Sequence, residues 1–128
     1  MVKQKQHVAG QLARQFCKVA KAHNEADNVR DRHTADALQV RMDALREEVT
    51  WHNAGCGAGA LFQLGTAACI VEIGMEGRCL VNDDREDVCV ITKNEALTLT
   101  RILQSLAAFV EANSNDRRSD FDRSYLGI

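Results

Sequence analysis

His52 and Cys56 are four residues apart, the spacing at which two side chains of one helix come close together. An imidazole beside a thiol is typical of a cysteine nucleophile or of part of a metal site. The glycines at 55, 57 and 59 predict that no helix continues through this segment, and the sequence places no acid or further ligands beside the pair. We therefore expect a helix end at 51–53 followed by a small buried thiol, with a Cys-His enzyme as an alternative.

Other residues that could bind a metal or phosphate have simpler explanations. Cys69, Cys79 and Cys89 are ten residues apart, whereas zinc ligands usually come in close pairs, so we expect them to fill a sheet. The acidic run at 83–87 lacks the glycine and alternating ligands of a calcium loop. The glycines at 55–59 have no preceding strand and no following Lys-Ser/Thr, as a P-loop requires. We predict no catalytic residue, metal or cofactor.

The first 24 residues contain no Asp or Glu, although the whole chain has a formal net charge of −2. Arg14, Lys18 and Lys21 lie at positions i, i+4 and i+7 and therefore project from one side of a helix. Arg30 and Arg32 follow in the next turn and can join them. Such a basic surface suits phosphates, because Arg binds them through two hydrogen bonds and Lys acts as a point charge. These five residues are our candidate ligand-binding residues.

A purely structural explanation of the same surface stays open. Lysines on a solvated helix face often pair with acids of a neighbouring helix, and Glu47 and Glu48 are available for this. The sequence does not separate the two explanations.

Two amphipathic stripes predict two N-terminal helices. Apolar residues recur at helical spacing in 3–22 and again in 38–51, and between them 23–33 is charged and nearly free of large apolar residues. That segment suits either a turn or the middle of one long helix. We choose a helical hairpin, because two helices can bury their stripes against each other, whereas one long helix needs a partner chain. Leu38, Met42, Leu45 and Val49 are the side chains expected in the seam.

The second half of the chain predicts a small antiparallel sheet covered by a helix. Three short runs rich in β-branched residues, 68–73, 78–82 and 88–91, are separated by turn-forming segments. Residues 61–68 could be either the lead-in to the first strand or a short helix. A final helix from 93 to about 112 is expected to place an apolar stripe on the sheet: Ala96, Leu99, Leu103, Leu106 and Val110. The fold class expected is therefore α+β.

The start of this last helix is the sharpest local pattern in the chain. Thr92 and Glu95 have the spacing of a capping box, in which each side chain accepts a hydrogen bond from the backbone N–H of the other residue. This predicts where the helix begins.

Length and composition predict one compact unit with two parts, a hairpin at 1–54 and a sheet with its helix at 55–128. The chain has 128 residues, 45% of them hydrophobic, and an odd number of cysteines, five, without a secretory signal. We see no run of about 18 apolar residues. A cytoplasmic protein that does not contact a membrane is expected.

The second predicted helix ends in Trp51-x-Asn53-Ala54, and a small β-containing part is expected after the hairpin. In these two features the chain resembles phage-encoded sponge proteins that sequester cyclic-nucleotide immune signals. The likeness covers roughly the first 54 residues. It implies a non-enzymatic oligomer that buries a phosphate-rich ligand among helices of several chains. The proline-containing turn expected of such hairpins is missing. Phe62 and Phe121 are candidates for the aromatic ring that stacks on a base.

The function expected from the sequence is therefore binding without catalysis: a homo-oligomer that captures an anionic nucleotide-type ligand, such as a cyclic nucleotide, or nucleic acid. A protein–protein inhibitor or structural oligomer without a small ligand is the first alternative. The Cys-His enzyme is the second.

Overall fold

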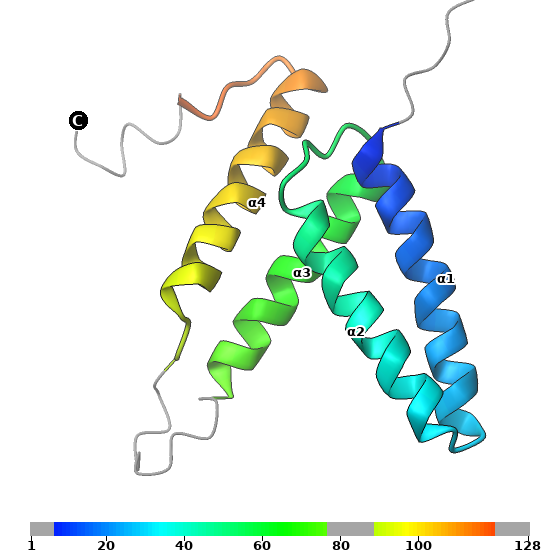
Figure 1. Cartoon of the computed structure of the whole chain (residues 1–128). Helices are drawn as coiled ribbons and strands as arrows, with labels where there is room; N and C mark the ends of the chain where they lie inside the picture. The colour runs from blue at the N-terminus through cyan, green and yellow to red at the C-terminus, as the bar shows by residue number, and fades with distance from the viewer. Residues whose placement is uncertain (1–6, 77–88, 120–128) are drawn as a thin grey trace, which may run out of the picture.

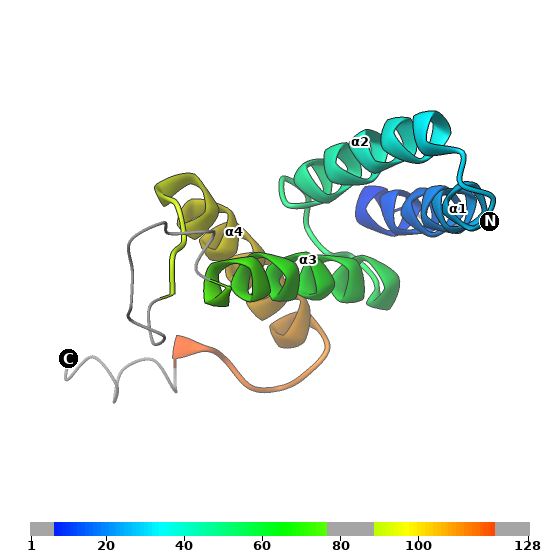
Figure 2. The same cartoon turned by 90° about the horizontal axis from the view of Figure 1, so that it is seen from below.

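The computed structural model describes residues 7–76 and 89–119, and this part of the chain folds into four α-helices without a strand (Figure 1). Their bounds are Val8–Asn28 for α1, Arg32–Val49 for α2, Gly57–Met75 for α3 and Lys93–Ala112 for α4. Figure 2 shows α3 between the α1–α2 hairpin on one side and α4 on the other. The fold is all-α.

The expected α+β class with a three-stranded sheet is therefore wrong. Residues 68–73 lie in the C-terminal half of α3 and 89–91 form no strand, whereas 78–82 lie outside the described residues. β-Branched residues are only weakly disfavoured in helices, and packing easily overrides that preference. Here α3 contacts each of the three other described helices, and residues 68–73 belong to it.

The choice of a hairpin over one long helix is confirmed. Val29, Arg30 and Asp31 connect α1 to α2, and Arg30 adopts the left-handed conformation with φ 59°. The Asp31 carboxylate caps α2 by accepting from the backbone N–H of Thr34 at 3.2 Å. Hydrogen bonding to Thr34, by its side chain and then by its backbone, lowers the pKa of Asp31, so the cap stays ionised at neutral pH.

The core of the hairpin is the predicted seam extended onto α3. Leu45 and Val49 are fully buried, and they pack with Ala9 and Leu12 of α1. Met42 is buried and Leu38 is half-buried, so the apolar stripe of α2 faces inward as expected. Phe16, Val19 and Phe62 cover the cluster from α1 and α3. Apolar burial of this kind is the main favourable contribution to folding.

A buried amide joins the remaining elements. Gln63 of α3 is fully buried and donates to the carbonyl oxygens of Val49, at 3.0 Å, and His52, at 2.6 Å. Its own oxygen accepts from the Ser105 hydroxyl of α4 at 2.7 Å, and that hydroxyl accepts from the Ala54 backbone N–H at 2.9 Å. The end of α2, the following loop and α4 are thus all fixed to α3 through one side chain.

The capping box of α4 is confirmed. The Glu95 N–H donates to the Thr92 hydroxyl at 3.1 Å, and the Thr92 N–H donates to the Glu95 carboxylate at 2.9 Å. The expected orientation of the helix is wrong. Thr98, Ile102 and Ser105 are its buried residues, whereas Leu103 and Val110 of the apolar stripe are each 58% exposed. Without a sheet beneath it, α4 packs on the polar and small residues of α3.

We expect Thr92→Ala to lower the free energy of unfolding by about 0.5–2 kcal/mol, because α4 loses its N-cap. Thr100→Ala is the matched control, since the Thr100 hydroxyl bonds only to the carbonyl of Ala96 within an exposed turn. Urea unfolding followed by far-UV circular dichroism measures both. Equal midpoints for the two variants would contradict the role of the cap.

We expect Gln63→Ala to cost about 1–3 kcal/mol of stability, because the Val49 and His52 carbonyls and the Ser105 hydroxyl each lose one hydrogen bond. Gln104→Ala, an exposed change on the same side of α4 as the loop, should change the unfolding midpoint little. Thermal and urea unfolding provide the comparison. A Gln63→Ala protein as stable as the control would show that the network does not hold the elements together.

Candidate functional site

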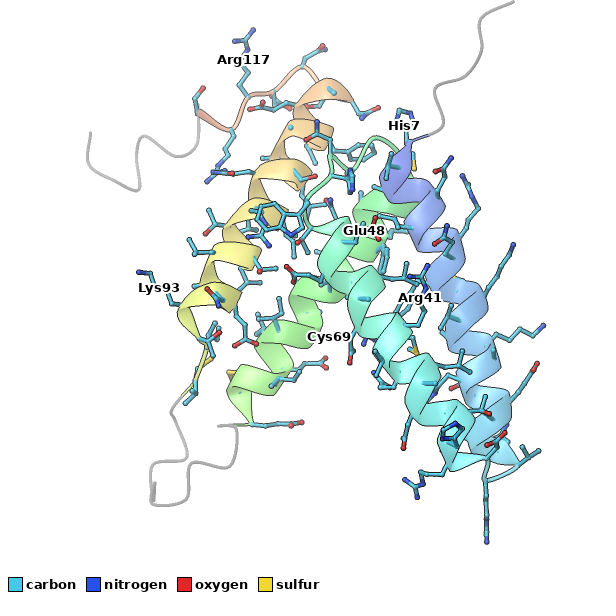
Figure 3. All side chains as sticks on the ribbon, viewed as in Figure 1. His7, Arg41, Glu48, Cys69, Lys93 and Arg117 are labelled. Atoms are coloured by element: carbon cyan, nitrogen blue, oxygen red, sulfur yellow. The ribbon has the colours of Figure 1, made fainter. Side chains whose placement is uncertain are left out.

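A groove of about 610 Å³ opens between α1 and α3, with one side chain contributed by α2. Its volume lies in the range of small-molecule sites. Most of its lining is apolar, and the residues are Ala13, Arg14, Phe16, Cys17, Lys18, Arg46, Ala58, Leu61, Phe62, Gly65, Thr66 and Cys69. Figure 3 shows side chains from the three helices in this region, with Cys69 labelled on α3.

Two aromatic rings form part of the groove. Phe16 of α1 and Phe62 of α3 have their centroids 4.7 Å apart at an interplanar angle of 36°. The guanidinium carbon of Arg46 lies 4.9 Å from the centroid of Phe16, a cation–π distance. Both rings are half-buried, so they present an apolar surface on which a planar or aliphatic group can pack.

The groove has a basic edge made by Arg14 and Lys18. Both side chains are exposed, and neither forms an ion pair with any other residue that the structure describes. Arg46 differs, because it already contacts the Asp43 carboxylate at 3.4 Å. Two exposed cations beside an apolar surface can attract an anion whose remaining part is apolar.

The groove exists because α1 and α3 approach closely at one end. A Cβ on Gly59 would collide with the Ala54 carbonyl oxygen and lie 2.7 Å from the Cβ of Ala9. A Cβ on Gly10 would lie 2.7 Å from the Cys56 sulfur. Gly59, one of the three glycines predicted to mark a boundary, therefore has a packing role, whereas a Cβ on Gly57 would meet nothing within 4 Å. Gly59 and Gly10 allow the two helices to approach at their N-terminal ends.

The structure brings together only part of the predicted site. Arg14 and Lys18 line the groove, whereas Lys21 is exposed further along α1 and does not line it. Arg30 lies in the hairpin turn and Arg32 begins α2, both exposed and outside the groove lining. Sequence reasoning missed Arg46 and Phe16 as members of the site, because only the pairing of α2 with α1 places them together.

Glu47 and Glu48, the predicted partners of the basic helix, contact other groups or solvent. Glu47 accepts from the Trp51 indole N–H at 3.2 Å and lies 3.6 Å from Arg101 of α4. Glu48 is exposed. Arg14 and Lys18 are therefore not neutralised by α2 in the way that the structural explanation required.

His52 and Cys56 do not form a catalytic pair in the described chain. Helix α2 ends at Val49, and no hydrogen bond joins the His52 ring to the Cys56 thiol. Cys56 is the N-cap residue of α3, and His52 contributes its backbone carbonyl to Gln63. The Trp51-x-Asn53-Ala54 run has a structural role as well, because Trp51 stacks on Arg101 at 3.6 Å and Ala54 donates to Ser105.

The remaining candidates give no metal site in the parts of the chain that are described, since no cluster of His, Cys, Asp or Glu is found there. Cys69 lines the groove and Cys89 is exposed before α4. Cys79, the acidic run 83–87 and Phe121 lie outside the described residues. Phe62, the other aromatic candidate, lies in the groove.

Helix α3 has the length and composition of a membrane span, with 22% of its apolar window buried. The expectation that no stretch of the chain has this character is therefore too strict. Length and composition are weak grounds for a span, because core helices of soluble proteins meet the same test.

Comparison of the chain with protein-family models, with curated proteins and with solved structures gives no significant match. The chemistry of the groove is therefore the basis for a functional proposal.

We expect Gly59→Ala to destabilise the protein by about 1–3 kcal/mol, because its Cβ has no room between α1 and the loop. Gly65→Ala is the matched control in the same helix, since nothing lies within 4 Å of its Cβ. Gly65→Ala should stabilise α3 by about 0.5–1 kcal/mol, because alanine is a better helix former than glycine. Unfolding midpoints that move in the same direction for both variants would contradict the close helix contact.

Proposed function

We propose that this protein binds an anionic nucleotide-type ligand in the α1–α3 groove and does so without catalysis. The observation that carries the proposal is the position of Arg14 and Lys18, which form no ion pair within residues 7–76 and 89–119, beside the Phe16–Phe62 pair. A nucleotide offers a planar base for the rings and phosphates for the cations.

The contacts divide the ligand into two parts. The base packs on the apolar floor, where Leu61 and Phe62 of α3 face Phe16 of α1. The phosphates lie toward Arg14, which can donate two parallel hydrogen bonds, and Lys18, one helical turn further along α1. The resemblance of the N-terminal hairpin to cyclic-nucleotide sponge proteins makes cyclic AMP the first probe.

Self-association and a cytoplasmic location belong to the same proposal. A chain of this size with an apolar helix on its surface gains stability from a second copy. Unpaired cysteines agree with a reducing compartment. A protein–protein inhibitor or structural oligomer remains the alternative when no anion binds.

A second candidate ligand is an anionic amphiphile such as a fatty acid. The nearly wholly apolar lining favours it, because a base has polar edges that need partners, and the Thr66 hydroxyl already donates to the Phe62 carbonyl. Titration with dodecanoate beside cyclic AMP distinguishes the two ligands.

We expect Arg14→Gln/Lys18→Gln to weaken binding of cyclic AMP at least tenfold, about 1.4 kcal/mol, in isothermal titration calorimetry at low salt. Arg30→Gln/Arg32→Gln removes the same charge outside the groove and should leave binding within about twofold. Gln is a comparable helix former, so the fold should be kept. The wild-type chain binding neither probe at low salt would refute the proposal.

The same variants distinguish a nucleotide from nucleic acid. Binding of single-stranded DNA should fall steeply with added salt, because each neutralised phosphate releases counterions, whereas a small nucleotide should show a milder effect. If nucleic acid binds along the whole basic helix, Lys21→Gln and the Arg30/Arg32 variant should also weaken its binding. Equal losses in both double variants would therefore favour nucleic acid over the groove ligand.

A further inference from the structure

Helix α3 carries an exposed apolar stripe that no other described helix covers. Its members are spaced alternately by three and four residues along nearly the full length of the helix: Leu61, Leu64, Ala68, Val71 and Met75. Leu61 is 70%, Leu64 53% and Met75 66% exposed. The contacts with the rest of the fold are made by other sides of α3, through Gly59, Gln63, Thr66 and Gly74.

The stripe is large enough to be an interface. Its five side chains expose on the order of 400 Å² of mainly apolar surface, the size of a patch that usually has a function. Two such stripes in contact remove on the order of 800 Å² from water, and flanking residues add to this. A stable interface needs about 1,000 Å² in total, so a second copy supplies the required area when the flanking residues add roughly 200 Å² to the two stripes.

The spacing indicates that another helix is the occupant. Apolar residues alternating by three and four positions form the seam along which two helices interlock their side chains. Gly65 and Ala68 lie in the middle of the stripe, with larger side chains towards both ends. This arrangement matches itself when the second helix runs in the opposite direction, as a twofold interface requires.

The distribution of charge along α3 also favours antiparallel pairing of the two helices. The N-terminal half of the stripe lies beside the basic edge of the groove, because Leu61 and Gly65 line the groove with Arg14 and Lys18. The C-terminal half is flanked by the exposed Glu72 and Glu76. Antiparallel helices place these acids of one copy toward the basic edge of the other, whereas parallel helices place like charges together.

We propose that two copies of this chain associate through the α3 stripe, with their α3 helices antiparallel around Ala68. This inference rests on the self-association part of the proposed function and identifies its surface. The stripe and the groove share Leu61, so dimerisation and ligand binding are measured separately.

The test is sedimentation velocity of the full chain at about 50 µM, a concentration at which an interface of modest area is populated. We expect a wild-type dimer and at least a tenfold weaker association for Leu64→Glu, because an unpaired carboxylate enters the apolar seam. Val40→Glu is the matched control, since Val40 is 70% exposed on α2 and outside the stripe. It should remain dimeric, and circular dichroism checks the fold of both variants.

A second variant keeps the test decisive if Leu64→Glu does not fold. Ala68→Cys lies at the centre of the proposed twofold, so oxidation should give a disulfide-linked dimer well above the wild-type level. Val40→Cys should not. Failure of Ala68→Cys to cross-link would contradict the antiparallel pairing.

Three results overturn the inference: a monomeric wild-type chain, a Leu64→Glu variant as dimeric as the wild type, or a wild-type chain that floats with phosphatidylcholine vesicles, which assigns the stripe to lipid. Cyclic AMP binding is measured in parallel on Leu64→Glu, whose substitution lies outside the groove lining. A wild-type monomer that binds cyclic AMP would contradict only the dimer. A wild-type dimer that binds no ligand would contradict only the groove ligand.

Discussion

The Gln63 amide is the interaction on which the arrangement of this protein depends. It is fully buried and uses both N–H groups and its oxygen, linking the end of α2, the loop after it and α4. A buried amide left unpaired is costly, so only the native arrangement satisfies all of these groups together. The network therefore fixes relative helix positions, whereas the apolar cluster supplies much of the stability.

This polar contact also explains why the second half of the protein has apolar residues on its surface. Helices α3 and α4 are joined by the hydrogen bond from Ser105 to Gln63. Ile102 is buried on the same side of α4, whereas Leu61, Leu64 and Leu103 are exposed. Part of α3 completes the hairpin core through Phe62, and part lines the groove. The stripe shares Leu61 with the groove and otherwise lies outside it, so one helix serves the core, the proposed ligand site and the proposed interface.

The candidate site combines local and long-range features. The i, i+4 spacing of Arg14 and Lys18 was visible in the sequence, because helical geometry alone brings them to one side. The side chains beside them were not visible, although Phe62 was already a candidate for the stacking ring on sequence grounds. Arg46 and Phe62 reach the groove only through the register of α2 and α3 on α1, and that register depends on the close contact at Gly59. The same packing leaves Arg30 and Arg32 outside the groove.

The sequence by itself determined the two amphipathic N-terminal segments, the buried stripe of α2 and the start of α4, because helical periodicity and the Thr92–Glu95 cap act within one or two turns. It left a hairpin and one long helix both open, and the structure shows the turn at 29–31. The sequence did not determine the secondary structure of residues 68–73 or the side of α4 that is buried. A short apolar run has no periodicity that separates strand from helix, and tertiary contacts decided for a helix. The side that α4 buries was decided by Ser105, whose hydroxyl meets Gln63 of another helix. Local pattern cannot anticipate a partner 42 residues away.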